Sequence, residues 1–511
     1  MTRRVIYSRR VRRAGVLAIL ALVLGYASVA QGGGVNQLAH FSLVRALSHG
    51  TAKVDPYHWQ TKDLSWYHGH YYSTKAPGLA FLTVAPYYVL DRSGALSLLS
   101  RATGATETAV ALWILGLIGA VIPTGVLLLL LRRVDDVLEP GFGTIAAVTA
   151  GVATLLFPFA TLFFDHALST GLGFAAFAVA WRAGDRLWLV GLGGLIAGFA
   201  VTSEYPLALV AAAVGLYLIS KGDAIRRGAV YAAGVVLGVL PLLLYDWLAF
   251  GSPFHLSYEN AIVRPGVSGH DVLGANEEGL FGVSTPDHGT AAQLLFGDAG
   301  LVTRTPVVVA AALGLFLLWR KGARREAVLA AALAVAFVVY NSGYSTPFGG
   351  GTPGPRFLIP MLPFLALGFG SAYRAWPWAT LAVALPSAVL MLGVTATEPT
   401  HARTWEWVDR ITDGSFAGAG IWPRLPLAVL VVASFVLALR ATPIPRPDGR
   451  QAAGALLALA AAVATAFAGP RLVGTNPELL ALVFLGLVAL VVAWHARVAP
   501  RRLILRGRGL S

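Results

Sequence analysis

The sequence contains no cysteine and few charged residues. Of its 511 residues, 13% are Asp, Glu, Lys or Arg and 56% are hydrophobic, and the mean hydropathy is +0.68. The absence of cysteine excludes disulfides, thiolate nucleophiles and zinc sites built on cysteine. Soluble proteins carry about 25% charged residues. The low charge therefore predicts a membrane protein with many spanning helices.

Apolar runs long enough to cross a membrane recur along the whole chain. A spanning helix needs about 20 mostly apolar residues, and this criterion predicts an all-α polytopic transmembrane protein with about 12 to 14 spans in a single domain covering residues 1–511. The candidate spans are 14–31, 106–131, 142–163, 165–181, 187–203, 205–220, 228–250, 305–319, 326–341, 357–373, 376–397, 425–439, 452–469 and 478–495. The segment 77–90 is apolar but short, which favours an interfacial or re-entrant helix.

The charges indicate which side of the membrane each loop faces. Six arginines precede the first span, which places the N-terminus in the cytoplasm by the positive-inside rule. With alternating loops, 26 of the 39 basic residues lie inside, including those of the tail 497–511, and 18 of the 25 acidic residues lie outside. Both termini are therefore predicted in the cytoplasm and the long loops 32–105 and 251–304 on the outer face. Since topology accounts for the basic charge, no nucleic-acid partner is expected.

The first outer loop begins with a predicted helix. Val35, Ala39, Leu43 and Leu47 recur every four residues, which indicates an apolar stripe on a helix that lies along the membrane interface. Other apolar residues interrupt its polar side. A helix packed against protein on both sides is therefore an equal alternative.

Polar and aromatic residues are concentrated in the stretch DPYHWQTKDLSWYHGHYYSTKAPG (55–78) of the same loop. An aromatic ring stacks on the C–H groups of a sugar and a carboxylate accepts its hydroxyl protons, so this composition suits a sugar or a lipid headgroup. The candidate substrate-binding residues here are Trp66, His68, His70, Tyr71 and Tyr72. An interfacial aromatic belt is the alternative for the Trp and Tyr residues, but it explains the two acids of the stretch less well.

More polar residues fall at the predicted outer ends of spans. Asp165 and His166 follow the run LFPFATLFF, and Glu204 lies at the next outer turn. An acid surrounded by apolar residues is costly unless it is paired or lines a wet cavity, so all three are candidate substrate-binding residues. The alternative for Asp165 is a helix cap. The loop GYSTPFGGGTPGPR ends at Arg356, whose guanidinium could bind a phosphate beside the glycine N–H groups.

In the order and outward placement of these motifs, the chain resembles the GT-C glycosyltransferases, in particular bacterial relatives of protein O-mannosyltransferases and of the lipid A aminoarabinose transferase. The similar features are the basic start before the first span, the long first outer loop, YSTKAPG (72–78), FGSPF (250–254) and GGGTPGPR (349–356). The resemblance implies a polyprenyl-phosphate sugar donor used on the outer face, with inversion at the anomeric carbon. It implies that Lys75 contacts the donor phosphate, and Arg356 is a second candidate.

One departure from this family concerns the catalytic base. Family members often carry an Asp-Glu pair after the first span, one acid serving as general base, where this chain has Asn36 and Gln37. An amide cannot take up the proton, so the base must come from elsewhere. Asp63 is the first candidate and Asp55 the second, because both lie in the aromatic stretch of the same loop.

Partners, cofactors and an alternative function follow from the same features. The expected partners are the lipid-linked donor, membrane lipids and a cell-envelope glycan, lipid or protein as acceptor. No cofactor is certain, although His68, His70, Asp63 and Asp165 could together bind a divalent cation. The alternative function is a transporter or flippase of a lipid-linked sugar or polymer. That function needs ionisable residues within the spans, and the middles of the predicted spans are almost uncharged.

Overall fold

The structure, a computed structural model, describes residues 9–262, 282–400, 406–413 and 424–476 together with residues 479 and 486. Within these ranges the strands form one antiparallel hairpin, β1 (Leu64–Tyr67) and β2 (His70–Ser73), and the other regular elements are helices. The prediction of an all-α polytopic membrane protein is confirmed.

The helices follow the apolar runs of the sequence. Those of the first outer loop are α2 (Val35–Ser48), η1 (Asp55–Gln60), α3 (Gly78–Arg92) and α4 (Ala95–Thr103). The others are α1 (Arg9–Ala27), α5 (Glu107–Gly116), η2 (Leu117–Val121), α6 (Ile122–Leu138), α7 (Gly143–Ala153), α8 (Leu156–Phe159), α9 (Asp165–Arg182), α10 (Leu187–Ser203), α11 (Leu207–Ile219), α12 (Ala224–Phe250), α14 (His288–Phe296), α15 (Leu301–Arg304), α16 (Val307–Arg320), α17 (Arg324–Ser342), η3 (Arg356–Met361), α18 (Leu362–Leu365), η4 (Ala366–Gly368), α19 (Phe369–Ala375), α20 (Pro377–Thr397), α21 (Glu406–Thr412), α22 (Leu425–Arg440) and α23 (Gly449–Thr475).

Among the described residues, six helices are long and apolar enough to cross a membrane. A seventh span results if the segments His288–Arg304 and Val307–Arg320, bent by 91°, count as one, and five further apolar helices have 10 to 17 residues. The expected span at 478–495 lies outside the described residues apart from 479 and 486.

The continuous span predicted at 142–163 is wrong, because the helix breaks at Thr154. This residue is extended, with φ of −130° and ψ of 172°. Its hydroxyl donates to the carbonyl of Ala150 (2.6 Å) and accepts the N–H of Leu156 (3.3 Å). The Thr154 side chain thus satisfies groups on both sides of the break, and hydropathy alone does not detect this competition with the helix.

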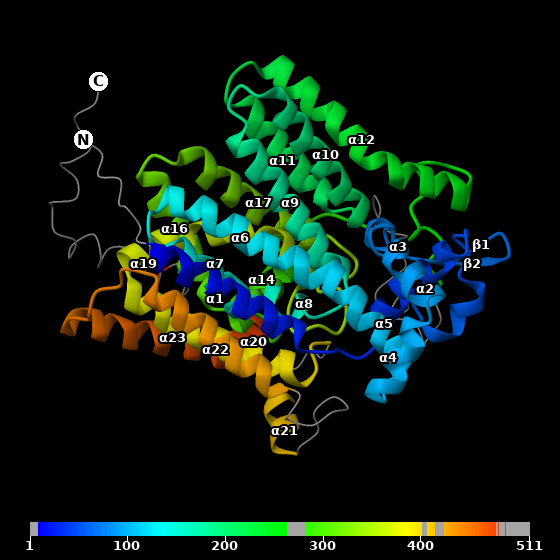
Figure 1. The fold of residues 1–511 in the computed structure, drawn as a ribbon. Coiled ribbons are helices and arrows are strands. Elements are labelled where there is room, and N and C mark those ends of the chain that lie inside the picture. Colours follow the sequence, from blue (N-terminus) through cyan, green and yellow to red (C-terminus); the bar gives the residue numbers. More distant parts are fainter. Residues whose placement is uncertain are drawn as a thin grey trace.

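Glycines allow close packing of α10 and α12. Gly194 and Gly198 on α10, and Gly234 and Gly238 on α12, each form a Gly-x-x-x-Gly motif, which lets helix backbones approach closely in membranes. A β-carbon on Gly198 would overlap the carbonyl oxygen of Val235. The same bundle of α10, α11 and α12 lies at one side of the molecule in Figure 1. This packing fixes the end of α10, after which Glu204 follows.

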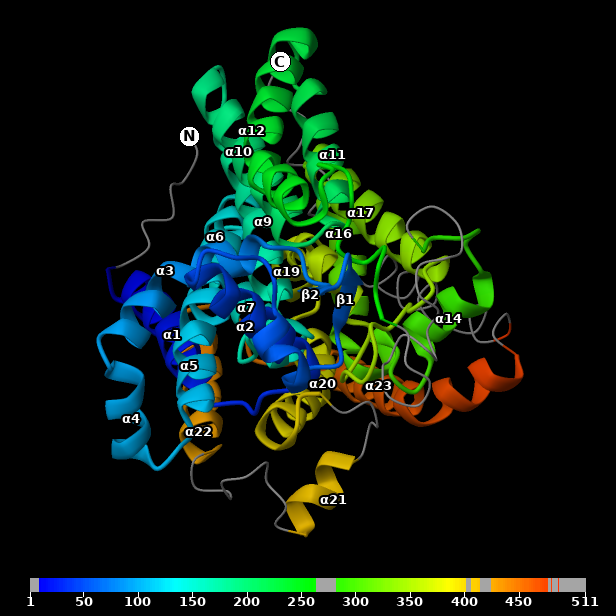
Figure 2. The same cartoon turned by 90° about the vertical axis from the view of Figure 1, so that its right-hand side faces the viewer.

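The first outer loop gathers at one end of the molecule. Figure 1 shows α2, α3, α4 and the hairpin together there, and Figure 2 shows them from that end, in front of the helices. The hairpin binds the start of the second outer loop: the N–H of Trp66 donates to the carbonyl of Asn260 (2.9 Å) and the N–H of Ile262 to that of Leu64 (2.9 Å). The two long loops therefore form one layer.

The helix α2 packs mostly against protein. Nine of its 14 residues are buried, among them Asn36, Gln37 and His40. Its polar residues thus lie inside the molecule, as expected for the alternative of a helix covered on both sides.

We expect Gly198→Ile to lower the melting temperature of the protein purified in detergent, because the new side chain would force α10 and α12 apart. Overpacking of this kind costs about 1–3 kcal/mol, and more where the backbone cannot move. Gly454→Ala on α23 is the control, since an added β-carbon there has no neighbour within 4 Å. Equal melting temperatures of wild type and Gly198→Ile would contradict the packing.

Candidate functional site

Lys75 and Asp63 form a buried ion pair at the base of the hairpin. Lys75 Nζ lies 2.5 Å from Asp63 Oδ2, and the Lys75 side chain is only 4% exposed. The hydroxyl of Thr74 donates to the other oxygen, Asp63 Oδ1 (2.6 Å). Asp63 directly precedes β1 and Lys75 follows β2 by two residues, so the antiparallel pairing of Leu64 with Ser73 brings the two charges together.

A second buried cluster combines residues at the start of α9, the end of α10 and in α2. Asp165 begins α9, Glu204 follows α10, and both lie near His166. His166 Nδ1 is 2.9 Å from Glu204 Oε1, and Ser169 Oγ donates to Glu204 Oε2 (2.5 Å). Asp165 Oδ1 lies 3.7 Å from His40 Nε2 and 3.8 Å from His166 Nδ1, beyond hydrogen-bond distance. Hydrogen bonds thus fix Glu204 within the cluster, whereas Asp165 Oδ1 is not hydrogen-bonded to either histidine.

Arg356 lies beside the second cluster. Its guanidinium carbon is 5.5 Å from the ring centre of Phe164, the residue before Asp165, and 5.2 Å from that of Phe357. The Arg356 Nε is buried and has no hydrogen-bond partner among the residues that the structure describes. Gly349 has a φ of 80°, and a β-carbon there would overlap Arg356 Nε. A glycine at this position therefore leaves the space that the guanidinium occupies.

Two buried tyrosines, Tyr258 and Tyr344, lie next to these charges. Burial raises the pKa of Tyr258 well above its usual range, and Tyr344 together with the carboxylates of Asp63 and Asp165 raises it further. Burial also raises the pKa of Tyr344, whereas the charge of Arg356 lowers it and Asp63 again raises it. Lys75 Nζ lies 5.8 Å from the ring centre of Tyr258, and the ring of Tyr344 packs against that of Phe357, the residue after Arg356. Each tyrosine therefore adjoins one of the two cations.

A close contact of α3 with α10 joins the two clusters. A β-carbon on Gly78, the first residue of α3, would lie 2.6 Å from the Cα of Ser203. Gly78 follows Lys75 by three residues, and Ser203 directly precedes Glu204. The segment after β2 is thereby held against the end of α10.

Asp55 lies at the partly exposed surface of the hairpin. Its Oδ2 is 2.8 Å from His70 Nδ1 and its Oδ1 accepts the N–H of Tyr71 (2.7 Å). The side chains of Asp55 and His70 are 38% and 40% exposed. The ring of Trp66 packs edge-on against that of Tyr71, with 4.6 Å between their centres. These four residues form what we call the hairpin surface.

The other aromatic candidates of the loop have separate places. His68 is exposed at the turn of the hairpin, where its φ is 45°, and stacks on Tyr67 with 4.0 Å between ring centres. Tyr72 is buried against Phe250, with 5.0 Å between ring centres. The sequence suggested one group of candidates, whereas the hairpin divides them between its surface, its turn and the core.

Sequence reasoning missed His40, which is fully buried and faces Asp165. One signal in the sequence could have identified it. His40 follows Asn36 by four residues, so the two side chains lie on the same face of the helix. Tyr258 and Tyr344 were also missed. They lie in loops, where no periodicity indicates which side chains turn inward.

Among the described residues, Asp165, His166 and Glu204 form one group whose potential ligand atoms lie within 4.8 Å of one another, so they could bind a metal ion. In the structure both Glu204 oxygens are already engaged by His166 and Ser169. An ion would have to displace these hydrogen bonds. The other histidines proposed from the sequence are elsewhere, His70 with Asp55 and His68 at the hairpin turn.

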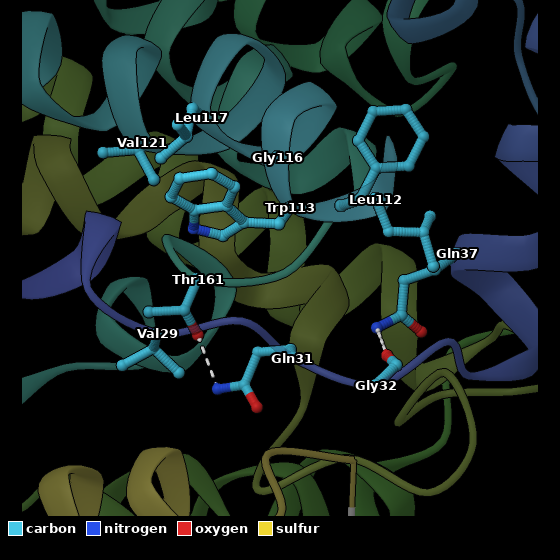
Figure 3. A pocket seen from close by; sticks show the side chains of 11 residues that line it. Val29, Gln31, Gly32, Gln37, Leu112, Trp113, Gly116, Leu117, Val121 and Thr161 are labelled. Atoms are coloured by element: carbon cyan, nitrogen blue, oxygen red, sulfur yellow. Dashed lines mark hydrogen bonds between the residues drawn. The ribbon is translucent and has the colours of Figure 1, made fainter. Parts of the chain in front are cut away.

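A small pocket adjoins the second cluster (Figure 3). Gln31 Nε2 donates to Thr161 Oγ1 (3.1 Å) across it, and Gln37 Nε2 donates to the carbonyl of Gly32 (2.9 Å). Phe163 lines the pocket and contacts the ring of His40 on its other side, with 6.2 Å between ring centres. The eleven lining residues include no ionisable side chain, so the pocket offers no acid or base for chemistry.

Comparisons with known proteins support a fold class. No protein-family model and no curated protein matches the chain. Among solved structures, the match described next shows a shared overall fold. The matching protein is ArnT from Cupriavidus metallidurans bound to undecaprenyl phosphate, with 14% identity and a TM-score of 0.50 over 91% of this chain and 77% of ArnT.

A second solved structure is more distant. It is the archaeal oligosaccharyltransferase AglB from Archaeoglobus fulgidus in complex with an inhibitory peptide and a dolichol-phosphate. The identity is 14% and the TM-score 0.47, over 86% of this chain and 56% of AglB. The fold assignment therefore rests on ArnT.

We expect divalent cations to leave the melting temperature of the purified protein unchanged, because binding would break the hydrogen bonds of Glu204. The measurement is a thermal melt with EDTA and then with MgCl₂, MnCl₂ or ZnCl₂. A bound ion at 100 times its Kd would stabilise the protein by roughly 2.7 kcal/mol. A rise in melting temperature with one cation that is absent in Glu204→Gln would show that the cluster is a metal site.

Proposed function

We propose that the protein transfers a sugar from a polyprenyl-phosphate donor to an acceptor hydroxyl on the outer side of the cytoplasmic membrane, with inversion at the anomeric carbon. The observation that carries this proposal is the position of two cations, the buried Lys75 and the partly buried Arg356, beside two clusters that the contact of Gly78 with Ser203 joins. Cations at a buried site suit a phosphate, since charge-assisted hydrogen bonds are strongest away from water. The undecaprenyl phosphate bound to ArnT is a donor component of this kind.

The ion pair with Asp63 prepares Lys75 for this role. Burying the charge of a lysine that is 4% exposed is costly without a partner. Asp63 compensates this charge and fixes the direction of the ammonium before the donor arrives. Because an ammonium has three N–H donors, Lys75 can bind a phosphate oxygen while it remains bonded to Asp63.

Arg356 supplies the second contact to the phosphate. Its buried Nε has no partner among the described residues, so a bound phosphate oxygen would satisfy it. During transfer the bond between the anomeric carbon and the phosphate oxygen breaks, and its electron pair stays on the phosphate. Lys75 and Arg356 stabilise this growing charge, as fixed cations in a buried site do.

The acceptor is a hydroxyl of a cell-envelope glycan, lipid or protein. The hairpin surface of Asp55, Trp66, His70 and Tyr71 is where we expect its first contact, since exposed rings and a carboxylate suit sugar hydroxyls. In this proposal two cations at the phosphate supply the charge compensation for which some transferases use a divalent cation.

We expect Lys75→Met and Arg356→Gln each to weaken the binding of undecaprenyl phosphate by about tenfold or more, since a hydrogen bond to a charged group contributes roughly 1.5–3 kcal/mol. Binding is measured by microscale thermophoresis in detergent. Lys62→Met is the control, because Lys62 is an exposed lysine of the same loop. Wild-type affinity in both site variants would contradict the phosphate site.

The reaction itself is tested by incubating the purified protein with a panel of polyprenyl-phosphate sugars and cell-envelope extract. We expect loss of sugar from one of these lipids and its appearance on an acceptor. Movement of the intact lipid-linked sugar across proteoliposomes without its cleavage would indicate a flippase instead.

The orientation in the membrane is tested with single cysteines, for which the native chain provides a background free of thiols. We expect Ser93→Cys, between α3 and α4, to react with a membrane-impermeant maleimide in intact cells. Asp185→Cys, between α9 and α10, should react only after permeabilisation. The reverse pattern would place the proposed site in the cytoplasm.

A further inference from the structure

The structure raises the question of which group accepts the proton of the acceptor hydroxyl. Asp63, the first candidate from the sequence, has both oxygens engaged, one by Lys75 and one by Thr74. Asp63 would have to share or give up one of these contacts to take up a proton. Asp55 is bonded to His70 and Tyr71 at the hairpin surface. Both acids have structural tasks.

We propose that Asp165 is the general base of the transfer and that His40 is a positioning residue that holds it. This inference rests on the proposed function and assigns one residue of its site. Neither residue belongs to the acid pair that the family carries after its first span.

The surroundings of Asp165 fit this role. Its Oδ1 is buried and accepts no hydrogen bond from any described residue, and 10% of its side chain is exposed. The carboxylate therefore combines low engagement with access to the site. It also lies next to one proposed phosphate contact, because the Arg356 guanidinium stacks on the preceding residue, Phe164. An acceptor hydroxyl beside the anomeric carbon would then lie within reach of this carboxylate.

His40 acts through Asp165, because its own ring is fully buried. Its Nε2 lies 3.7 Å from Asp165 Oδ1, and within the described part of the chain neither ring nitrogen has a hydrogen-bond partner. Phe163 fixes the ring on another side through an edge contact. Together with His166, whose Nδ1 is 3.8 Å from the same oxygen, His40 confines Oδ1.

Asn36 and Gln37 are amides and cannot act as the general base. The position of His40 in α2 shows how this helix can still contribute to the site. Asn36 and His40 are four residues apart, so both lie on the same buried face of α2. Where the related enzymes present an acid from this helix, this chain presents an imidazole one turn later, next to an acid from α9. In this proposal the proton acceptor, Asp165, lies at the start of α9, and α2 positions it through His40.

The step balances as follows. The acceptor oxygen attacks the anomeric carbon and forms the new glycosidic bond, while the bond from that carbon to the phosphate oxygen breaks and leaves its electron pair on the phosphate. The hydroxyl proton passes to the Asp165 carboxylate. The products are the glycosylated acceptor and the polyprenyl phosphate, and Asp165 later returns the proton to water.

The test compares Asp165→Asn with Asp63→Asn in the purified full-length protein, using a donor that the wild type accepts. We expect Asp165→Asn to lower kcat by roughly 10²–10⁴-fold, the usual contribution of a general base, with the affinity for undecaprenyl phosphate unchanged. Asp63→Asn should instead weaken donor binding, because Lys75 loses its partner. The control is Asp91→Asn, an exposed acid at the end of α3 that should behave as wild type.

Azide tests whether Asp165 has a chemical or a structural role. This anionic nucleophile has no proton to lose, so its attack on the anomeric carbon needs no general base. Azide should restore sugar release in Asp165→Asn but not in Lys75→Met. For His40→Gln we expect kcat to fall about 10- to 100-fold, as for a misplaced catalytic group, with the KM for the donor unchanged.

Several outcomes would overturn the assignment. Full turnover in Asp165→Asn would do so, as would a loss of kcat at unchanged donor affinity in Asp63→Asn, which would make Asp63 the base. Failure of azide to act on Asp165→Asn would assign its defect to structure. Absence of transfer by the wild type with every donor would instead refute the proposed function, so the two failures are distinguishable.

Discussion

The buried ion pair of Lys75 and Asp63 is the interaction on which the site depends. Removing a lysine from water is unfavourable unless a partner compensates its charge, and the compensation is largest when the geometry is fixed. The hairpin provides this geometry, since its pairing places the residue before β1 beside the residues after β2. The hairpin of this long polar loop is thus folded around one ion pair.

The rest of the architecture holds other groups against that pair. The glycine contacts of α10 with α12 fix the position of Glu204, and the contact of Gly78 with Ser203 joins the lysine segment to it. The Phe164 and Phe357 rings support Arg356 from a third part of the chain. Four distant segments therefore meet in one site. The three acids of the site therefore have different roles. Asp63 orients a cation, Glu204 orients a histidine, and Asp165 remains available to accept a proton.

Much of the fold follows from the sequence, because a membrane span needs an apolar run and little else. The α10 helix, for example, has the bounds expected for it, 187–203. Hydropathy does not show where a side chain competes with the helix for backbone hydrogen bonds, as Thr154 does. The candidate site is harder to predict than the helices. Charge and aromatic content identified the right loop and Lys75, but only the hairpin register separates Asp55 from Asp63, and only tertiary packing turns His40 toward Asp165. Such contacts join residues over 100 positions apart, for which one sequence contains no local signal.

The most direct test of the account is a cryo-electron microscopy structure of the protein with undecaprenyl phosphate bound. The account predicts phosphate density within hydrogen-bond distance of both Lys75 Nζ and the Arg356 guanidinium, with the Lys75–Asp63 pair intact and space for a sugar between the phosphate and Asp165. Density for the phosphate at another place, or bound to neither cation, would contradict it.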